Sequence, residues 1–212
     1  MAWALDTRII AQYNEHIFII WSNTLLHPHV IATNTQKVLS LLTKFSDQEF
    51  YEREIARSLG ISSGSANRAL NELYSSGVVT RRREGKMFFY SIDSRNAVIP
   101  ELKKIISLLL IEPLVETLKA ISSRIVLYGS CAQGTDTSAS DLDLFVVSRN
   151  RQSVFDAING FRFPKGYEDV HIQAVIKTPV ELLESGGSEH VFLEEVENGI
   201  ELWEKIANDS RV

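Results

Sequence analysis

The sequence predicts an α+β fold, in which a helix-rich first half is followed by an α/β second half with a small mixed sheet. Three observations predict this organisation. Apolar residues recur at helical spacing before residue 77, whereas short apolar strands flank a glycine–serine turn after residue 123. Residues 33–95 hold ten Lys and Arg against seven Asp and Glu, while residues 96–212 hold eleven against eighteen. A basic segment joined to an acidic remainder indicates a nucleic-acid-binding module attached to a second unit.

The composition is that of a globular protein. The chain has 212 residues, of which 44% are hydrophobic, enough for one large domain or two small ones. No run approaches the ~20 apolar residues of a membrane span, and the first residues lack the basic start of a secretory signal. The single cysteine, Cys131, can form no disulfide within the chain. We therefore expect a cytoplasmic protein without membrane contacts.

Residues 1–32 are expected to form a first segment with one helix, from Asp6 to about Trp21. Apolar residues recur there at helical spacing and form a stripe along one face. The stripe consists of Ile9, Ile10, Tyr13, Ile17 and Ile20. We expect this segment to serve in packing or dimerisation.

Residues 33–95 are expected to form a second segment that begins with three helices. Asn34 or Thr35 would cap the first, whose apolar positions run from Val38 to Phe45. The next helix is expected over residues 50–59, a tight corner over residues 60–62, and a third helix over residues 63–76. Small and polar side chains at the start of the third helix are suited to the DNA major groove. Those expected to contact DNA are Ser63, Ser65, Asn67 and Arg68.

Residues 78–92 are expected to form a hairpin that turns at Glu84–Gly85. Its basic side chains could reach phosphates or a minor groove. They are Arg81, Arg82, Arg83 and Lys86. Together with the preceding helices, the hairpin resembles the winged helix-turn-helix domains of prokaryotic transcription regulators, and this resemblance implies double-stranded DNA as a partner. The alternative is a winged helix that makes only protein contacts and whose wing charges are solvated.

Residues 96–122 are expected to connect the two halves, as one long helix or as two helices broken near Pro113. Apolar residues from Leu102 to Ile121 follow helical spacing, so this connector would pack on both halves. Such stripes after a wing often dimerise regulators of this kind, and a homodimer would suit a palindromic DNA site.

Residues 123–212 contain the candidate metal-binding and catalytic residues. A strand over residues 124–128 ends in the turn Gly129–Ser130, and a second strand over residues 142–147 follows a polar spacer. Asp141 and Asp143 are two positions apart, so they point to the same face. Two adjacent like charges usually need a cation between them, and carboxylate oxygens suit Mg²⁺. The alternative is a turn followed by two solvated aspartates on an edge strand.

The order of these residues resembles the nucleotidyltransferase superfamily that includes DNA polymerase beta. The short spacer is most similar to the minimal nucleotidyltransferases of bacteria and archaea. By this resemblance Gly129, Ser130 and Ser140 would bind ATP or another nucleoside triphosphate. Asp141 and Asp143 would hold Mg²⁺ or Mn²⁺ and take part in catalysis. The implied activity is transfer of a nucleotidyl group to an acceptor that the sequence does not identify.

The family usually supplies a third carboxylate from a later strand, which is expected here over residues 170–176. His171 and Gln173 occupy the positions that face the site, and Asp169 lies at the strand's entrance. Asp169 could complete the metal site, and His171 could act as a general base near neutral pH. A regulator with an inactive domain that senses a nucleotide, or only makes contacts, is the first alternative. The second is an antitoxin-like protein with a small helical toxin as partner.

The remaining elements are expected at the end of the chain. A helix should begin at Pro179, because proline suits the first turn of a helix. A second helix is expected over residues 189–198, and a closing strand over residues 199–203.

Overall fold

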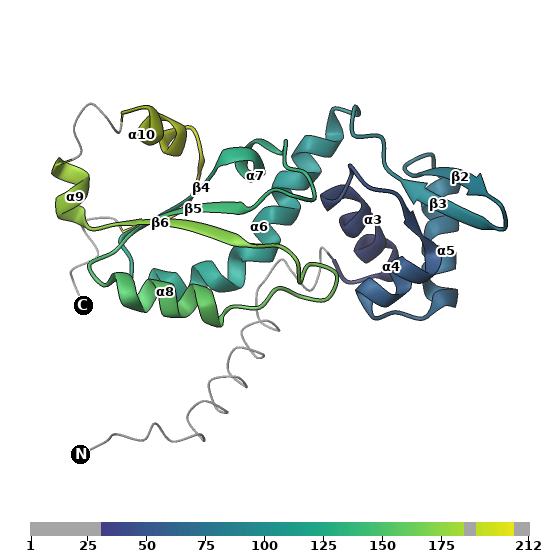
Figure 1. Ribbon diagram of the computed structural model, residues 1–212, viewed down its shortest axis with the longest axis horizontal. Coiled ribbons are helices and arrows are strands. Elements are labelled where there is room, and N and C mark those ends of the chain that lie inside the picture. The colour runs from purple at the N-terminus through teal and green to yellow at the C-terminus, as the bar shows by residue number, and fades with distance from the viewer. Residues whose placement is uncertain (1–30, 185–189, 206–212) are drawn as a thin grey trace, which may run out of the picture.

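The computed structural model describes residues 31–184 and 190–205. The helix expected over residues 6–21 lies outside these ranges. The described residues form an α+β protein whose two small sheets lie on either side of a long helix (Figure 1). No helix in the described ranges is long and apolar enough to cross a membrane.

The first half has the helices and the antiparallel hairpin of a winged helix-turn-helix. Its helices are α3 (Asn34–Lys44), α4 (Glu52–Leu59) and α5 (Ser63–Ser75). Its strands are β1 (Phe50–Tyr51), β2 (Thr80–Glu84) and β3 (Met87–Ser91), in the sheet order β1-β3-β2. The helices enclose a core of buried aliphatic side chains that includes Val38, Leu41, Ile55 and Leu70.

The predicted helix starts need two corrections. Thr33, rather than Asn34 or Thr35, caps α3: its hydroxyl accepts a hydrogen bond from the Gln36 amide, and Gln36 reaches back to the Thr33 amide. Phe50 and Tyr51 do not begin α4, because they pair with β3 as strand β1. The corner between α4 and α5 is as expected. Gly60 ends α4 with a φ of 63°.

The second half is built around a four-stranded sheet. Its strands are β4 (Arg124–Tyr128), β5 (Leu142–Val147), β6 (Ile172–Lys177) and β7 (Ile200–Glu204). The order is β6-β5-β4-β7; β4 is antiparallel to both neighbours, and β5 and β6 are parallel. Its helices are α6 (Val98–Lys119), α7 (Gly129–Gln133), α8 (Arg151–Gly160), α9 (Pro179–Glu184) and α10 (His190–Glu197).

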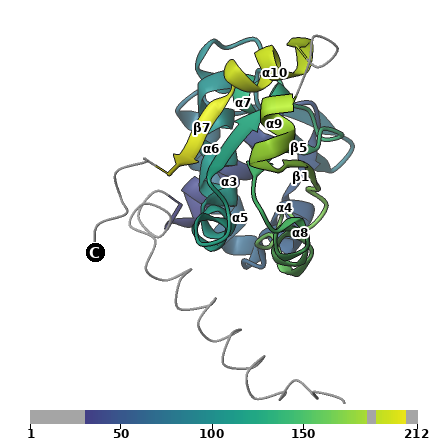
Figure 2. The ribbon, with the colours of Figure 1, turned by 90° about the vertical axis from the view of Figure 1, so that its left-hand side faces the viewer.

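Helices cover both faces of this sheet (Figures 1 and 2). Leu142, Leu144 and Val146 of β5 point to one face and pack with buried residues of α6 and α8. Phe145 and Val147 point to the opposite face and pack with α10. Because of this alternation along β5, Asp143, which lies between Leu142 and Leu144, is presented on the face opposite to α6 and α8.

Helix α6 is continuous through Pro113, although a break was one of the two expectations. Proline removes one helical hydrogen bond and usually kinks a helix. Here Ile111, Pro113 and Leu114 are all buried, so packing on either side of the proline holds the helix together.

Candidate functional site

The turn after β4 brings the backbone against one of the predicted metal ligands. Gly129 has a φ of 68°, which favours glycine. A Cβ atom at this position would lie 2.5 Å from Oδ2 of Asp143. Glycine is therefore needed both for the backbone conformation and for the close approach of the turn to the carboxylate. The residue before it, Tyr128, pairs with Asp143 across β4 and β5.

Asp141 and Asp143 lie on either side of Leu142, which is fully buried. The two carboxylates therefore face away from the α6 side of the sheet, as the strand alternation predicts. Asp141 is exposed and Asp143 is half-buried. Burial raises the pKa of Asp143 above its usual value, and the negative charges of Asp141 and Glu195 raise it further. The structure thus brings Gly129, Asp141 and Asp143 together.

Ser130 follows Gly129 in α7 and is half-buried. The first amides of a helix have no acceptor within the helix, so they are available to an anion. Ser140 lies at the other end of the spacer, where its hydroxyl accepts a hydrogen bond of 3.0 Å from the Thr137 amide. Ser140 therefore shapes the spacer in this structure.

Strand β6 and the residue before it run alongside β5 and its aspartates. Gln173 lies in register with Asp143, and the Leu142 amide donates to the His171 carbonyl. His171 is exposed just before β6, and Asp169 is exposed in the preceding turn. Within residues 31–184 and 190–205, no three His, Cys, Asp or Glu side chains are grouped closely enough to hold a metal ion. Asp169 is therefore not assembled with Asp141 and Asp143 into such a group.

Glu195 is a neighbour of the site that the sequence analysis missed. Helix α10 packs on this face through Phe192, whose ring lies edge-on to Tyr128 at 5.6 Å and to Phe145 at 5.9 Å. Glu195 is one helical turn further along. Burial raises the pKa of Tyr128 to about 12, with contributions from the charges of Asp143 and Glu195. In the sequence, only the three-residue spacing of Phe192 and Glu195 indicates that the two side chains lie on the same side of a helix.

The residues present fit a divalent metal. Asp141 and Asp143 offer oxygen donors, which Mg²⁺ and Mn²⁺ prefer. Burial first, and then the charges of Asp141 and Glu195, raise the pKa of Asp143, so a cation between the two aspartates would be stabilised electrostatically. Gly129 leaves the space that a side chain would fill beside Asp143.

The candidate nucleic-acid interface starts with α5. Ser63, Asn67 and Arg68 are exposed, and Ser65 is half-buried. Asn67 donates a hydrogen bond of 2.6 Å to Glu52, and Arg68 donates to the Ser65 hydroxyl at 3.4 Å. The predicted side chains fall into two pairs at helical spacing, Ser63 with Asn67 and Ser65 with Arg68. Asn67 would have to leave Glu52 to contact a base.

The basic side chains of the wing differ in the contacts that they already make within the protein. Arg82 forms ion pairs with Glu49 at 2.7 Å and with Glu84 at 2.8 Å. Hydrogen bonds to these two carboxylates raise its pKa. The other predicted wing residues are less constrained by acids: Arg81 stacks over the rings of Tyr74 and Phe88, Arg83 bonds the Gly85 carbonyl, and Lys86 is exposed at the tip.

Comparison with solved structures finds similarity to regulators with a winged helix-turn-helix. HlyU from Vibrio cholerae is 23% identical, over 47% of this chain and 90% of that chain, with a TM-score of 0.29. BldR from Sulfolobus solfataricus is 18% identical, over 55% and 94%, with a TM-score of 0.39. The homodimeric winged helix-turn-helix DNA-binding domain of Mb0332 from Mycobacterium bovis is 20% identical, over 57% and 91%, with a TM-score of 0.27.

No curated protein matches the sequence. The model of the nucleotidyltransferase domain family matches residues 110–205. This range contains the Gly129–Ser130 turn and both aspartates of the Asp-x-Asp pattern. Over residues 110–205, which are less than half of this chain, the sequence is therefore similar to nucleotidyltransferase domains.

Proposed function

We propose that this protein binds DNA through its winged helix and binds a nucleoside triphosphate with a divalent metal in its nucleotidyltransferase domain. The approach of the Gly129 turn to the Asp143 carboxylate carries the proposal. A phosphate-binding turn beside a metal-binding carboxylate is what nucleotidyl transfer requires. ATP is the proposed nucleotide, and a hydroxyl group is the proposed acceptor.

Each residue of the site has a proposed role. Gly129 and Ser130 hold phosphate oxygens through the backbone and the hydroxyl, and Asp141 and Asp143 hold Mg²⁺ or Mn²⁺. When bound, the metal neutralises charge on the phosphates during transfer. His171, which lies just before β6 and whose carbonyl accepts a hydrogen bond from the Leu142 amide, is the proposed base for the acceptor hydroxyl.

A second candidate function is nucleotide sensing without transfer. Gln173 favours it, because an uncharged amide lies in register with Asp143 where the family usually supplies an acid. A neutral amide cannot accept a proton from the acceptor and contributes less to holding a second metal ion. Incubation with ATP labelled at the α-phosphate distinguishes the two functions: an enzyme labels an acceptor, whereas a sensor binds ATP and labels nothing.

The binding site itself is tested by changing both carboxylates. We expect Asp141→Asn/Asp143→Asn to abolish binding of Mg²⁺–ATP in calorimetry, because the metal loses both charged ligands. The matched control is Asp156→Asn on α8, whose exposed carboxylate bonds Gln152 away from the site. Equal affinity for Mg²⁺–ATP in the double variant and the wild type would refute the metal assignment.

A further inference from the structure

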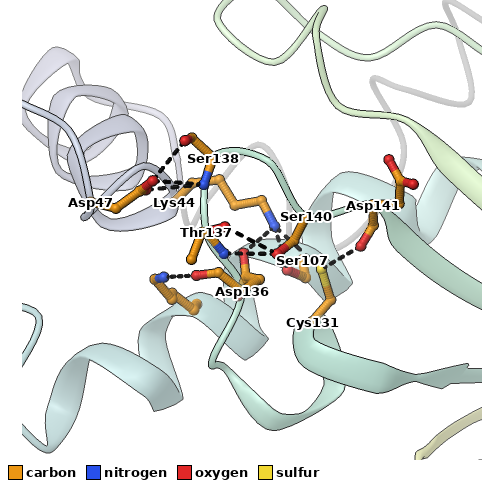
Figure 3. A network of polar contacts seen from close by, with 10 residues as sticks. Lys44, Asp47, Ser107, Cys131, Asp136, Thr137, Ser138, Ser140 and Asp141 are labelled. Atoms are coloured by element: carbon orange, nitrogen blue, oxygen red, sulfur yellow. Dashed lines mark hydrogen bonds and ion pairs between the residues drawn. The ribbon is translucent and has the colours of Figure 1, made fainter.

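The spacer over residues 134–140 joins the two parts of the nucleotide site. It begins directly after α7, which carries Ser130, and ends just before Asp141. In the middle of the spacer Asp136 is only 1% exposed. Its Oδ2 atom lies 2.6 Å from the Nζ atom of Lys44, the last residue of α3 (Figure 3). The winged helix thus supplies the cation that neutralises a buried acid next to the site.

Lys44 contacts more than Asp136. Its Nζ atom lies 3.3 Å from the Ser107 hydroxyl and 3.5 Å from the sulfur of Cys131 in α7. The Cys131 thiol in turn donates to the Asp141 carbonyl at 3.4 Å. One buried ammonium group therefore contacts both the helix after the glycine–serine turn and the middle of the spacer (Figure 3).

A second residue of the winged helix holds the spacer from outside. The Asp47 carboxylate accepts hydrogen bonds from the Ser138 amide at 3.0 Å and from the Ser138 hydroxyl at 2.6 Å. Although partial burial raises the pKa of Asp47, the hydrogen bonds from Ser138 help to lower it overall. Asp47 is exposed, so removing its carboxylate leaves the core intact.

Helix α6 completes the support. Lys103 donates to the Asp136 carbonyl, and Gly134 approaches the Pro100 carbonyl too closely for a side chain. The spacer is therefore held between α6 on one side and the end of α3 with its following loop on the other. Binding sites work when supporting residues fix the contacting groups to within about 0.5 Å.

We propose that Lys44 and Asp47 are positioning residues of the nucleotide site. They fix the spacer, and the spacer sets the distance between the Gly129–Ser130 turn and the carboxylates of Asp141 and Asp143. This inference rests on the proposed binding of a metal–nucleotide complex. It extends the site into the winged helix, where Lys44 lies 92 positions before Asp136 in the chain.

The test measures binding of Mn²⁺–ATP by calorimetry in the full-length chain. We expect Asp47→Ala to weaken binding about five-fold or more, and Lys44→Met to weaken it further, because the spacer loses its anchors. Asp47→Asn should restore part of the affinity, since its amide oxygen still accepts from Ser138. Asp47→Ala decides the test if Lys44→Met does not fold.

The control is another buried contact between the halves. The hydroxyls of Ser40 and Tyr167 lie 2.6 Å apart and do not touch the spacer. Tyr167→Phe should lower thermal stability and leave the affinity for Mn²⁺–ATP unchanged. Wild-type affinity in Asp47→Ala would overturn the positioning role alone. A wild-type protein that does not bind Mn²⁺–ATP would overturn the proposed function and this inference with it.

Discussion

At the scale of single residues, Asp143 carries an electrostatic cost in the metal-free protein. Burial comes first among the causes that raise its pKa, followed by the charges of Asp141 and Glu195. The folded state therefore binds a proton at Asp143 more readily than the unfolded state does. Folding stability falls as the pH rises from the unfolded pKa through the raised folded pKa, and the loss is complete above it. Residues kept at a cost to stability are typical of binding sites.

Because the charged Asp143 carboxylate lowers folding stability, Asp143→Asn should raise it. Since the amide carries no charge, the variant should be more thermostable than the wild type at pH 7 in EDTA, by about 1–3 °C. The gain should disappear at about pH 3, below the ordinary aspartate pKa of about 3.9, where the carboxyl is protonated in both the folded and the unfolded state. Thermal unfolding followed by circular dichroism at both pH values checks this. A melting temperature at pH 7 equal to or below that of the wild type would contradict it.

The residues of the site differ in how far the sequence predicts them. Gly129, Asp141 and Asp143 lie within 15 positions of one another, so turn chemistry and strand alternation predict their meeting. Glu195 comes near them only because α10 packs on the sheet through Phe192. The pair of Lys44 and Asp136 depends on the contact between the two halves, which no local pattern encodes.

At the scale of elements, we expect the wing to contribute unequally along its length to the proposed DNA affinity. Arg82 is already held by Glu49 and Glu84, and a DNA phosphate would have to replace both. Arg83 and Lys86 are exposed near the turn and form no ion pair within the described residues. In the proposed complex with DNA, the tip of the wing should therefore make most of the contacts with phosphates.

The prediction concerns the salt dependence of binding to a random-sequence DNA duplex. Arg83→Ala/Lys86→Ala should reduce the slope of log affinity against log salt by about two, one for each lost phosphate contact. Arg82→Ala, as the matched change on the same strand, should reduce the slope by less than one. Fluorescence anisotropy at several salt concentrations measures both slopes. A larger effect from Arg82 than from the tip pair would show that the wing binds DNA differently.

Local signals predict most of the elements and fail where tertiary contacts decide. The corner at Gly60 and the cap at Ser62 follow from their own chemistry, and Ser62 accepts a hydrogen bond from the Ser65 amide. Strand β1 was missed because two residues form a strand only when β3 lies beside them. Helix α8 was not predicted, since Val154 is its one fully buried residue and leaves a weak apolar stripe.

At the scale of the whole molecule, the spacer of the second half is held by Lys44 and Asp47 of the first half. If nucleotide binding shifts the spacer and, through Lys44 and Asp47, the winged helix, nucleotide and DNA must influence each other's affinity by the same factor. The charge difference along the sequence predicts two units but not this connection. The connection lies in buried contacts such as Lys44 with Asp136 and Ser40 with Tyr167.

We therefore expect Mn²⁺–ATP to change the affinity for DNA by about five-fold or more, and DNA to change the affinity for Mn²⁺–ATP equally. Anisotropy titrations with and without nucleotide, and calorimetry with and without duplex, give the two factors. In Asp47→Ala, both factors should approach one, so that each ligand no longer changes the affinity for the other. A wild-type protein in which the ligands bind independently would disprove the linkage.

The ion pair of Lys44 and Asp136 also constrains how this chain can change over evolution. A buried acid that loses its cation is strongly destabilising, whereas replacing both partners by apolar residues is often neutral. The two positions should therefore be substituted together or not at all. A fragment that starts at residue 110, where the family match begins, would lack both Lys44 and Lys103. Asp136 would then have neither of its two lysine donors.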